Sequence, residues 1–213
     1  SHKSMVVDAR VTADARALAG LVSDGLPGNA KNCGALSVYI DAALTANRHA
    51  LPLGRVASRF GWMGGGFLLG SEWIGDGLPV ALSPDVGLAQ VASGYRVKGS
   101  WGGWLDEVVN PGRLSPSMWL AVYNSVASIL IELLDLGDNW IIDRSGETSQ
   151  GKSTIGRVAA SVWGDPRTVM RSWKVSPAGV EAHAAILQNL PLILDDSKKA
   201  RRGEDVASVV YMH

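Results

Sequence analysis

Residues 146–154 read Gly146-Glu147-Thr148-Ser149-Gln150-Gly151-Lys152-Ser153-Thr154, the pattern G-x-x-x-x-G-K-S of a phosphate-binding loop, or Walker A motif. Its glycines let consecutive backbone N–H groups point into one concavity that holds phosphate oxygens. The Lys152 ammonium suits the β- and γ-phosphates of a nucleotide, and the Ser153 hydroxyl suits Mg²⁺. A helix that begins here adds its positive dipole end.

The flanking sequence supports this interpretation, because a phosphate-binding loop must follow a strand and open a helix. The apolar run Asn139–Asp143 predicts a short buried strand. Residues Lys152–Trp163 carry apolar side chains at three- and four-residue steps, and Gly164 and Pro166 end the pattern. The alternative is a glycine turn with an incidental lysine.

A second motif is the apolar stretch Leu190–Leu194, which ends in Asp195 and Asp196. This is the Walker B form. We expect Asp195 to assist the Mg²⁺ shell and Asp196 to orient or deprotonate the attacking water. Lys152, Asp195 and Asp196 are therefore the candidate catalytic residues, and Ser153 and Asp195 the candidate metal ligands. Taken alone, the stretch would read as a buried strand with a polar stop.

Composition indicates a packed globular protein: 213 residues, 46% hydrophobic and 19% charged, with 20 basic and 20 acidic residues. Net charge therefore gives no support for nucleic-acid binding, although a local basic patch is compatible with it. The single cysteine, Cys33, excludes an intramolecular disulfide and favours a small buried residue over a nucleophile. No apolar run reaches the length of a membrane span and no signal peptide is visible, so we expect a soluble cytoplasmic protein.

The N-terminal part predicts a helical pair followed by a small antiparallel sheet. The helices are expected at Val11–Leu26, with Thr12 as N-cap, and at Cys33–Asn47, packed on each other. A hairpin is expected from Arg55–Trp62 to Phe67–Gly70 through the turn Gly64-Gly65-Gly66. Further strands are expected at Pro79–Leu82 and Tyr95–Lys98.

Two arginines and then two aromatic residues precede the predicted hairpin turn: Arg55, Arg59, Phe60 and Trp62. Such a set can form a surface on which nucleic-acid bases stack. Aromatic residues on a sheet more often belong to the core, with arginines at its rim, and we favour that interpretation.

The second half predicts alternating helices and strands. We expect a turn-rich connector at Gly99–Gly112, then a mostly buried helix that Ser115-Pro116 opens and Gly137 ends. The remaining expected elements are a strand at Thr168–Trp173, a helix at Ser176–Leu190, the Walker B strand, a basic loop at Lys198–Arg202 and a helix from Glu204 to Met212. We favour a solvated loop at Lys198–Arg202; the alternative is that it touches DNA or the nucleotide of a neighbouring subunit.

These elements predict an α/β fold in two domains. Residues 5–111 form an N-terminal α+β domain, a helical pair and then a short-strand sheet. Residues 112–213 form a P-loop NTPase core with a parallel sheet, and the domain boundary falls near Pro111. No sensor residue or arginine finger can be placed in this chain. We therefore expect the core to be truncated at its C-terminal side.

Several motifs together resemble domain-of-unknown-function family 927. They are Arg59-Phe60-Gly61-Trp62 with its glycine-rich hairpin, the tryptophan-containing connector, the loop Gly146–Thr154, Ala159-Ala160-Ser161-Val162-Trp163-Gly164, and Leu190-Pro191-Leu192-Ile193-Leu194-Asp195-Asp196. The resemblance runs from about Leu51 to the end. This domain occurs in phage and mobile-element proteins described as helicases or primase-helicases, and relatives on cassette-type elements are similar to minichromosome-maintenance AAA+ helicases.

The resemblance implies an ATP-driven, Mg²⁺-dependent hydrolase that translocates on single-stranded or forked DNA as a ring, expected to be a hexamer, during replication of a mobile element. Gly146, Gly151, Lys152 and Ser153 would bind nucleotide and metal, and Asp195 would assist the metal. Asp196 departs from the family of ATPases, which usually carry Glu there, and its side chain is one methylene shorter. We expect this chain alone to bind nucleotide weakly and to hydrolyse it slowly or not at all.

Two other functions fit the same residues. A P-loop kinase or other phosphotransferase for a small metabolite shares the loop and needs no ring, and Arg201 and Arg202 would then belong to a lid. A non-enzymatic alternative makes Leu51–Gly112 a DNA- or partner-binding module attached to an inactive ATPase fragment. Stimulation of ATP turnover by DNA would favour the helicase, and stimulation by a metabolite would favour the kinase. DNA binding by a fragment that ends near Pro111 would favour the binding module.

Overall fold

The computed structural model describes residues 7–26, 28–29, 31–51, 54–113, 115–147 and 150–195. The chain forms two compact units, residues 1–56 and 57–213. The domain boundary predicted near Pro111 does not coincide with this division and stays a prediction, as does a C-terminal truncation of the core.

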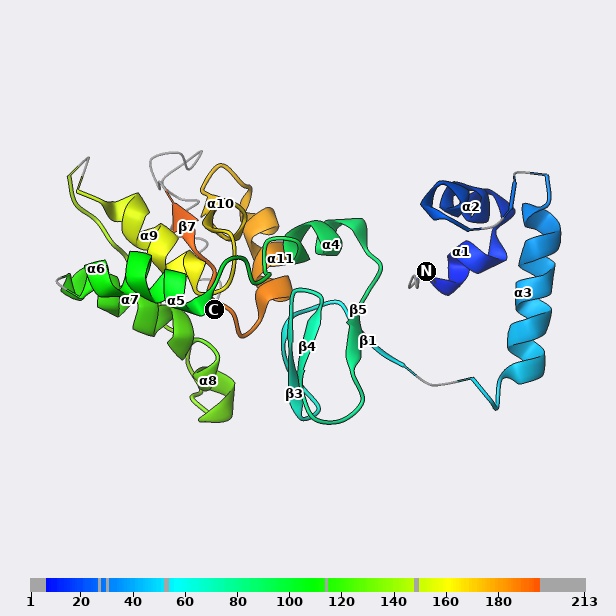
Figure 1. The fold of residues 1–213 in the computed structure, drawn as a ribbon, viewed down its shortest axis with the longest axis horizontal. Coiled ribbons are helices and arrows are strands. Elements are labelled where there is room, and N and C mark those ends of the chain that lie inside the picture. Colours follow the sequence, from blue (N-terminus) through cyan, green and yellow to red (C-terminus); the bar gives the residue numbers. More distant parts are fainter. Residues whose placement is uncertain are drawn as a thin grey trace. The chain divides into compact units, whose positions relative to one another are not determined.

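The first unit is helical (Figure 1). It contains α1 (Ala9–Ala13), α2 (Ala15–Gly20), the 3-10 turn η1 (Leu21–Asp24) and α3 (Cys33–Asn47), whose bounds match the prediction. The predicted single helix at Val11–Leu26 was wrong, because Asp8 and Asp14 cap two separate helices. Thr12 is not a cap; its hydroxyl donates to the Ala9 carbonyl inside α1 at 2.8 Å.

The helices of the first unit pack as predicted around two side chains, with α3 against both α1 and α2. Leu18 of α2 is 1% exposed, and Cys33 at the start of α3 is completely buried. Burial of the free thiol confirms that Cys33 acts as a small apolar residue. A hydrogen bond of 2.8 Å from the Ser37 hydroxyl to the Thr12 carbonyl ties α3 to α1.

A three-stranded antiparallel sheet lies near the start of the second unit: β2 (Gly61–Met63), β3 (Gly66–Leu69) and β4 (Glu72–Gly75). The predicted hairpin through Gly64 and Gly65 is confirmed, with Trp62 opposite Phe67. The single strand predicted at Arg55–Trp62 was wrong. The strand β1 spans Arg55–Ala57, and the next strand, β2, begins only at Gly61. The Ala57 carbonyl accepts a 2.8 Å bond from the Ser83 N–H, beside β5 (Val80–Leu82).

The next segment is more helical than predicted. Asp85 caps α4 (Val86–Ala92) by accepting from the Leu88 N–H at 2.8 Å, and no strand forms at Tyr95–Lys98. The expected turn-rich connector is also wrong. It is a continuous helical stretch made of α5 (Trp101–Trp104), the π-helical turn η2 (Leu105–Val109) and α6 (Asn110–Gly112). The Ser100 hydroxyl caps it by accepting from the Gly103 N–H at 3.1 Å.

The long helix after Ser115 is shorter and more exposed than predicted. Ser115 is the N-cap residue and Pro116 the first helical residue, as expected, but α7 ends at Ala127 and the short α8 spans Leu130–Leu133. Among the residues of α7 only Ser125 is buried. The prediction of a mostly buried helix was therefore wrong, and the apolar side chains of α7 and α8 are half-buried or exposed.

The C-terminal part of the second unit alternates helices and short strands. It contains α9 (Lys152–Ser161), α10 (Pro166–Val169), β6 (Arg171–Ser172), α11 (Pro177–Leu187) and β7 (Leu194–Asp195). The helices predicted after Gly151 and after Ser176 are confirmed. The strand expected at Thr168–Trp173 is correct only for β6, which pairs in parallel with β7. The basic loop predicted at Lys198–Arg202 and the helix predicted at Glu204–Met212 lie outside the described residues.

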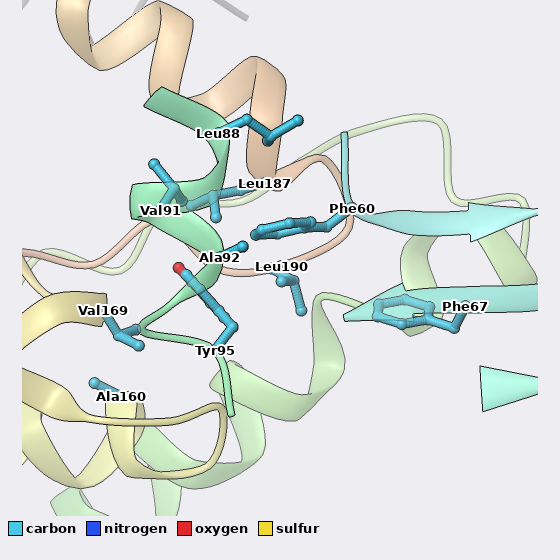
Figure 2. Packing of buried hydrophobic residues seen from close by; sticks show 10 residues of the cluster. All are labelled: Phe60, Phe67, Leu88, Val91, Ala92, Tyr95, Ala160, Val169, Leu187 and Leu190. Carbon is cyan, nitrogen blue, oxygen red and sulfur yellow. The ribbon is translucent and has the colours of Figure 1, made fainter. Parts of the chain in front are cut away.

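The core of the second unit draws buried side chains from the sheet, α4, α9, α10 and α11 (Figure 2). Phe60 is completely buried and its ring lies 5.3 Å from that of Tyr95. Burying one such ring stabilises the fold by about 1.5–3 kcal/mol. The remaining members of the cluster are Phe67, Leu88, Val91, Ala92, Ala160, Val169, Leu187 and Leu190. Residues on both sides of Pro111 thus share one core, which is a mixed α/β arrangement.

Candidate functional site

The loop predicted to bind phosphate leads directly into α9. Gly151 is the residue before the helix and has φ 75° and ψ 15°, a left-handed conformation that glycine adopts without strain. No side chain caps this helix start, and its first turn contains no acidic residue. Among the described residues, no side chain accepts from the backbone N–H groups of this first turn, an arrangement that favours an anion.

The side chain of Lys152 turns back over the loop. Its ammonium donates a 2.7 Å hydrogen bond to the Gly146 carbonyl and a second bond to the Glu147 carbonyl. Gly146 has φ 148°, another backbone conformation that favours glycine. The ammonium is thus hydrogen-bonded to backbone carbonyl oxygens of the loop.

The two sequence motifs meet at Ser153 and Asp195. The Ser153 hydroxyl, in the first turn of α9, donates a 3.1 Å hydrogen bond to Asp195 Oδ1, at the end of β7. Both side chains are half-buried. A hydroxyl and a carboxylate at this separation form a donor set of hard oxygens, the kind that Mg²⁺ prefers.

Other predicted parts of the site differ or are not described. Thr148 and Ser149 of the loop and Asp196 lie outside the described residues. The predicted strand Asn139–Asp143 was wrong: these residues form no strand, and Trp140, Ile141 and Ile142 are 41%, 59% and 48% exposed. A strand needs a neighbour that takes its backbone hydrogen bonds, and no described residue pairs with this run. The Trp140 indole N–H donates instead to the Asn124 side chain.

A buried serine fixes α9 against α7. The Ser125 hydroxyl, 2% exposed, donates to the Ala159 carbonyl at 2.8 Å and accepts from the Trp163 indole N–H at 2.9 Å. A second indole holds the end of α9, because Trp104 Nε1 donates to the Ser161 hydroxyl at 2.9 Å. The helix that follows the loop is therefore anchored at its C-terminal end by α5 and α7.

The stretch Arg59-Phe60-Gly61-Trp62 packs against the end of α11. The Phe60 N–H donates to the Ile186 carbonyl at 2.8 Å, and the Trp62 N–H donates to Asn189 Oδ1 at 3.0 Å. The Trp62 indole donates to the Ile129 carbonyl at 2.8 Å. Phe60 is buried, so the core interpretation of these aromatics is confirmed, and the alternative of a base-stacking surface on Phe60 and Trp62 was wrong.

A hollow of about 220 Å³ lies between α11 and the two parallel strands, lined by Val175, Gly179, Val180, Leu192 and Leu194 together with Arg171 and His183. The Arg171 Nε–H donates to His183 Nε2 at 3.4 Å. Burial, and secondarily the charge of Arg171, lowers the pKa of His183 to about 4. His183 is therefore neutral at neutral pH.

Sequence reasoning missed Ser125, Trp104, Ser161 and Asn189. None of them belongs to a chemical motif, and each acts through one or two hydrogen bonds across 34 to 127 residues of chain. The spacing of Trp101 and Trp104, three residues apart after a serine, was the one available signal, since it is a helical spacing.

Within the described part of the chain, no group of three or more His, Cys, Asp or Glu side chains lies together as a metal site. A Mg²⁺ ion held by one carboxylate, one hydroxyl and nucleotide phosphates needs no such group. Among the same residues, no helix is both long enough and apolar enough to span a bilayer.

The fold resembles that of a solved structure, described as SCCmec type IV Cch, an active helicase. The TM-score is 0.69 at 19% sequence identity, over 92% of this chain and 39% of the helicase chain. At this identity the likeness concerns the fold, and this chain corresponds to well under half of that protein. No curated protein matches the sequence.

The family profile described as Domain of unknown function (DUF927) matches residues 2–213. The chain belongs to this family. The match includes the first unit, so it extends further toward the N-terminus than the resemblance read from the motifs, which began near Leu51.

Proposed function

We propose that the loop 146–154 and α9 bind the phosphates of MgATP, and that the chain is the ATP-binding and ATP-hydrolysing part of a DNA helicase or replication initiator from a phage or mobile element. The observation that carries the proposal is the hydrogen bond between Ser153 and Asp195. It joins the two residues that a P-loop ATPase uses at its magnesium ion, from two separate motifs.

In this proposal each residue has one task. The backbone N–H groups at the start of α9 hold phosphate oxygens. Lys152 moves its ammonium from the Gly146 and Glu147 carbonyls to the β- and γ-phosphates. Ser153 and Asp195 hold Mg²⁺, directly or through water, and Asp196 orients or deprotonates the attacking water. When bound, Mg²⁺ supplies neutralisation of the charge on the phosphate oxygens.

The helicase part of the proposal is supported by the likeness in fold to a chain described as an active helicase and by membership in the family. The DNA substrate is single-stranded or forked, the complete protein assembles as a ring, six-membered in our expectation, and it acts in the cytoplasm, where such DNA lies. P-loop ATPases of this kind need an arginine from a neighbouring subunit for rapid hydrolysis. Nucleotide binding is therefore the first property to test.

The test is isothermal calorimetry with ATP-γ-S and with ADP in the presence of Mg²⁺. We expect binding by the wild-type chain and at least about tenfold weaker binding by Lys152→Ala, since a charge-assisted bond to phosphate is worth about 1.5–3 kcal/mol. Lys31→Ala is the matched control, because Lys31 is an exposed lysine of the first unit and the loop belongs to the second. Equal affinity of Lys152→Ala and the control would overturn the nucleotide site.

A further inference from the structure

An exposed pair of stacked tryptophans lies at the start of α5. The rings of Trp101 and Trp104 are 5.3 Å apart and inclined by 24°, and Trp101 is 72% exposed. One face of the outer indole is therefore covered by Trp104 and much of the rest of the ring is open to solvent. A large flat apolar surface left open in this way is a feature of binding sites.

The inner ring of the pair is fixed in place. Trp104 donates its indole N–H to the Ser161 hydroxyl at 2.9 Å, and that hydroxyl donates to the Val158 carbonyl at 2.7 Å. The helix beneath the rings is fixed by the Ser100 cap. Because Trp104 cannot turn without losing its hydrogen bond, Trp101 rests on a rigid support, and a ligand that stacks on it loses little entropy by ordering the protein.

Positive charge adjoins the exposed ring. Arg96 and Lys98 are both exposed, and Lys98 is three residues before Trp101, a chain distance of at most about 10 Å. Asp106 and Glu107 follow Trp104 along the chain. Asp165 lies near Lys98: bonds with Arg167, and to a lesser extent the charge of Lys98, lower its pKa, and its carboxylate is paired with Arg167 at 2.7 Å. An aromatic face beside cations matches a ligand that has both planar rings and negative charge.

A second pair of stacked aromatic rings, on α7, serves for comparison. Trp119 and Tyr123 on α7 stack at 5.3 Å and 22°, and Tyr123 is 64% exposed. However, α7 contains no Lys, Arg, Asp or Glu. Exposed cations precede Trp101 in the chain, whereas α7 itself supplies none to the Trp119 pair.

We propose that Trp101 is a stacking platform for a base of single-stranded DNA, and that Arg96 and Lys98 contact the adjoining phosphates. The inference rests on the proposed function for its choice of DNA, and it names a contact that this function leaves unassigned. Stacking on an aromatic side chain is tolerant of sequence, because every base has an aromatic face, and it suits an enzyme that must move along any strand.

The test is fluorescence anisotropy of a labelled oligothymidylate titrated with the 213-residue chain. We expect Trp101→Ala to weaken binding about fivefold to a hundredfold, the range measured for loss of one base-stacking contact. Trp101→Phe should retain most of the affinity. Tyr123→Ala, the matched control, should stay within about twofold of wild type.

Salt dependence tests the cations. Lys98→Ala should reduce the slope of log affinity against log salt by about 0.7, the value for one phosphate contact on a single strand. Circular dichroism melting of each variant checks folding. If Trp101→Ala does not fold, Trp101→Phe and Lys98→Glu decide the question, since Lys98→Glu must weaken binding while Trp101→Phe does not.

The outcomes separate this inference from the proposed function. DNA binding by wild type with no loss in Trp101→Ala would overturn the platform and leave the helicase proposal intact. Nucleotide binding without any DNA binding would contradict both the platform and the DNA substrate. Equal losses in Trp101→Ala and Tyr123→Ala would also overturn it. The platform would also be overturned if Trp101→Ala changed the oligomeric state measured by sedimentation but left the DNA affinity unchanged, because the surface would then join copies of the chain.

Discussion

Ser153 and Asp195 are 42 residues apart in the chain, yet the hydroxyl of the first donates a 3.1 Å hydrogen bond to the carboxylate of the second. The contact joins the first turn of α9 to the end of β7. It thus brings the loop that would hold phosphates next to the carboxylate that would hold the metal.

We predict that Ser153→Ala and Asp195→Asn remove the magnesium dependence of nucleotide binding. Each variant deletes one oxygen of the proposed donor set, so affinity for ADP measured with Mg²⁺ should fall about 10–100-fold, toward the value measured with EDTA. Calorimetry with and without Mg²⁺ measures both values. Glu181→Gln, an exposed carboxylate on α11, is the control. Magnesium dependence retained in both variants would contradict the assignment.

Gly61 should tolerate no larger residue. It has φ 96°, and a Cβ atom built on it would lie 2.2 Å from Asn189 Oδ1. Gly61→Ala must therefore strain the backbone and displace Asn189, which bonds to the Trp62 N–H and to Glu132. We expect a loss of about 2–5 kcal/mol in unfolding free energy, measured by urea denaturation.

Gly77→Ala is the matched control for Gly61. Gly77 has nearly the same φ, 97°, but a Cβ there meets nothing within 4 Å. Its loss should be about 1–2 kcal/mol, the cost of the left-handed conformation alone. Equal losses for the two variants would show that the contact with Asn189 does not matter.

Replacing Ser125 should leave the half-buried indole of Trp163 without an acceptor. The Ser125 hydroxyl accepts from Trp163 Nε1 at 2.9 Å, and Ser125→Ala removes that acceptor together with its own bond to Ala159. We expect a loss of about 1–3 kcal/mol in a denaturant melt. Ser128→Ala, which removes only a donor to the Ser125 carbonyl, should cost no more than about 1 kcal/mol.

A double-mutant cycle measures the coupling energy between Ser125 and Trp163. In the Trp163→Phe background no indole N–H remains to be satisfied, so Ser125→Ala should cost measurably less than in wild type. Equal costs of Ser125→Ala in the two backgrounds would show that the hydrogen bond from Trp163 does not contribute to that cost.

His183 should make stability depend on pH. Burial and Arg171 lower its pKa to about 4, whereas the ring in the unfolded chain titrates near the ordinary value of 6.5. Between these values the unfolded state binds more protons, so unfolding free energy should fall as pH decreases from about 6.5 to about 4. The ring is only half-buried, which limits the loss to about 1 kcal/mol. His183→Gln should remove this part of the pH dependence, and an unchanged profile would contradict it.

Local signals predicted some of the regular elements. The bounds of α3 were correct, as were the glycine turn between β2 and β3 and the serine-proline start of α11, because caps and turn residues act within a few positions of chain. The meeting of Ser153 with Asp195 followed from two motifs whose chemistry requires them to converge.

Predictions failed where distant contacts decide the structure. Asn139–Asp143 has the composition of a buried strand, but a strand also needs a partner, and no described residue pairs with it. The glycines of the stretch from 99 to 112 indicated turns, yet the Ser100 cap and the stacking of Trp101 on Trp104 favour a helix. Trp101 was missed as a surface residue because composition cannot tell an exposed aromatic from a core one.

Asn189 links two parts of the molecule mechanically. Its carbonyl oxygen accepts from the N–H of Trp62 in the hairpin, and its amide donates to Glu132 at 2.9 Å. The same residue is six positions before Asp195, in the segment that leads from α11 into β7. One amide side chain therefore joins the glycine hairpin and α8 to the segment that leads into the strand carrying Asp195.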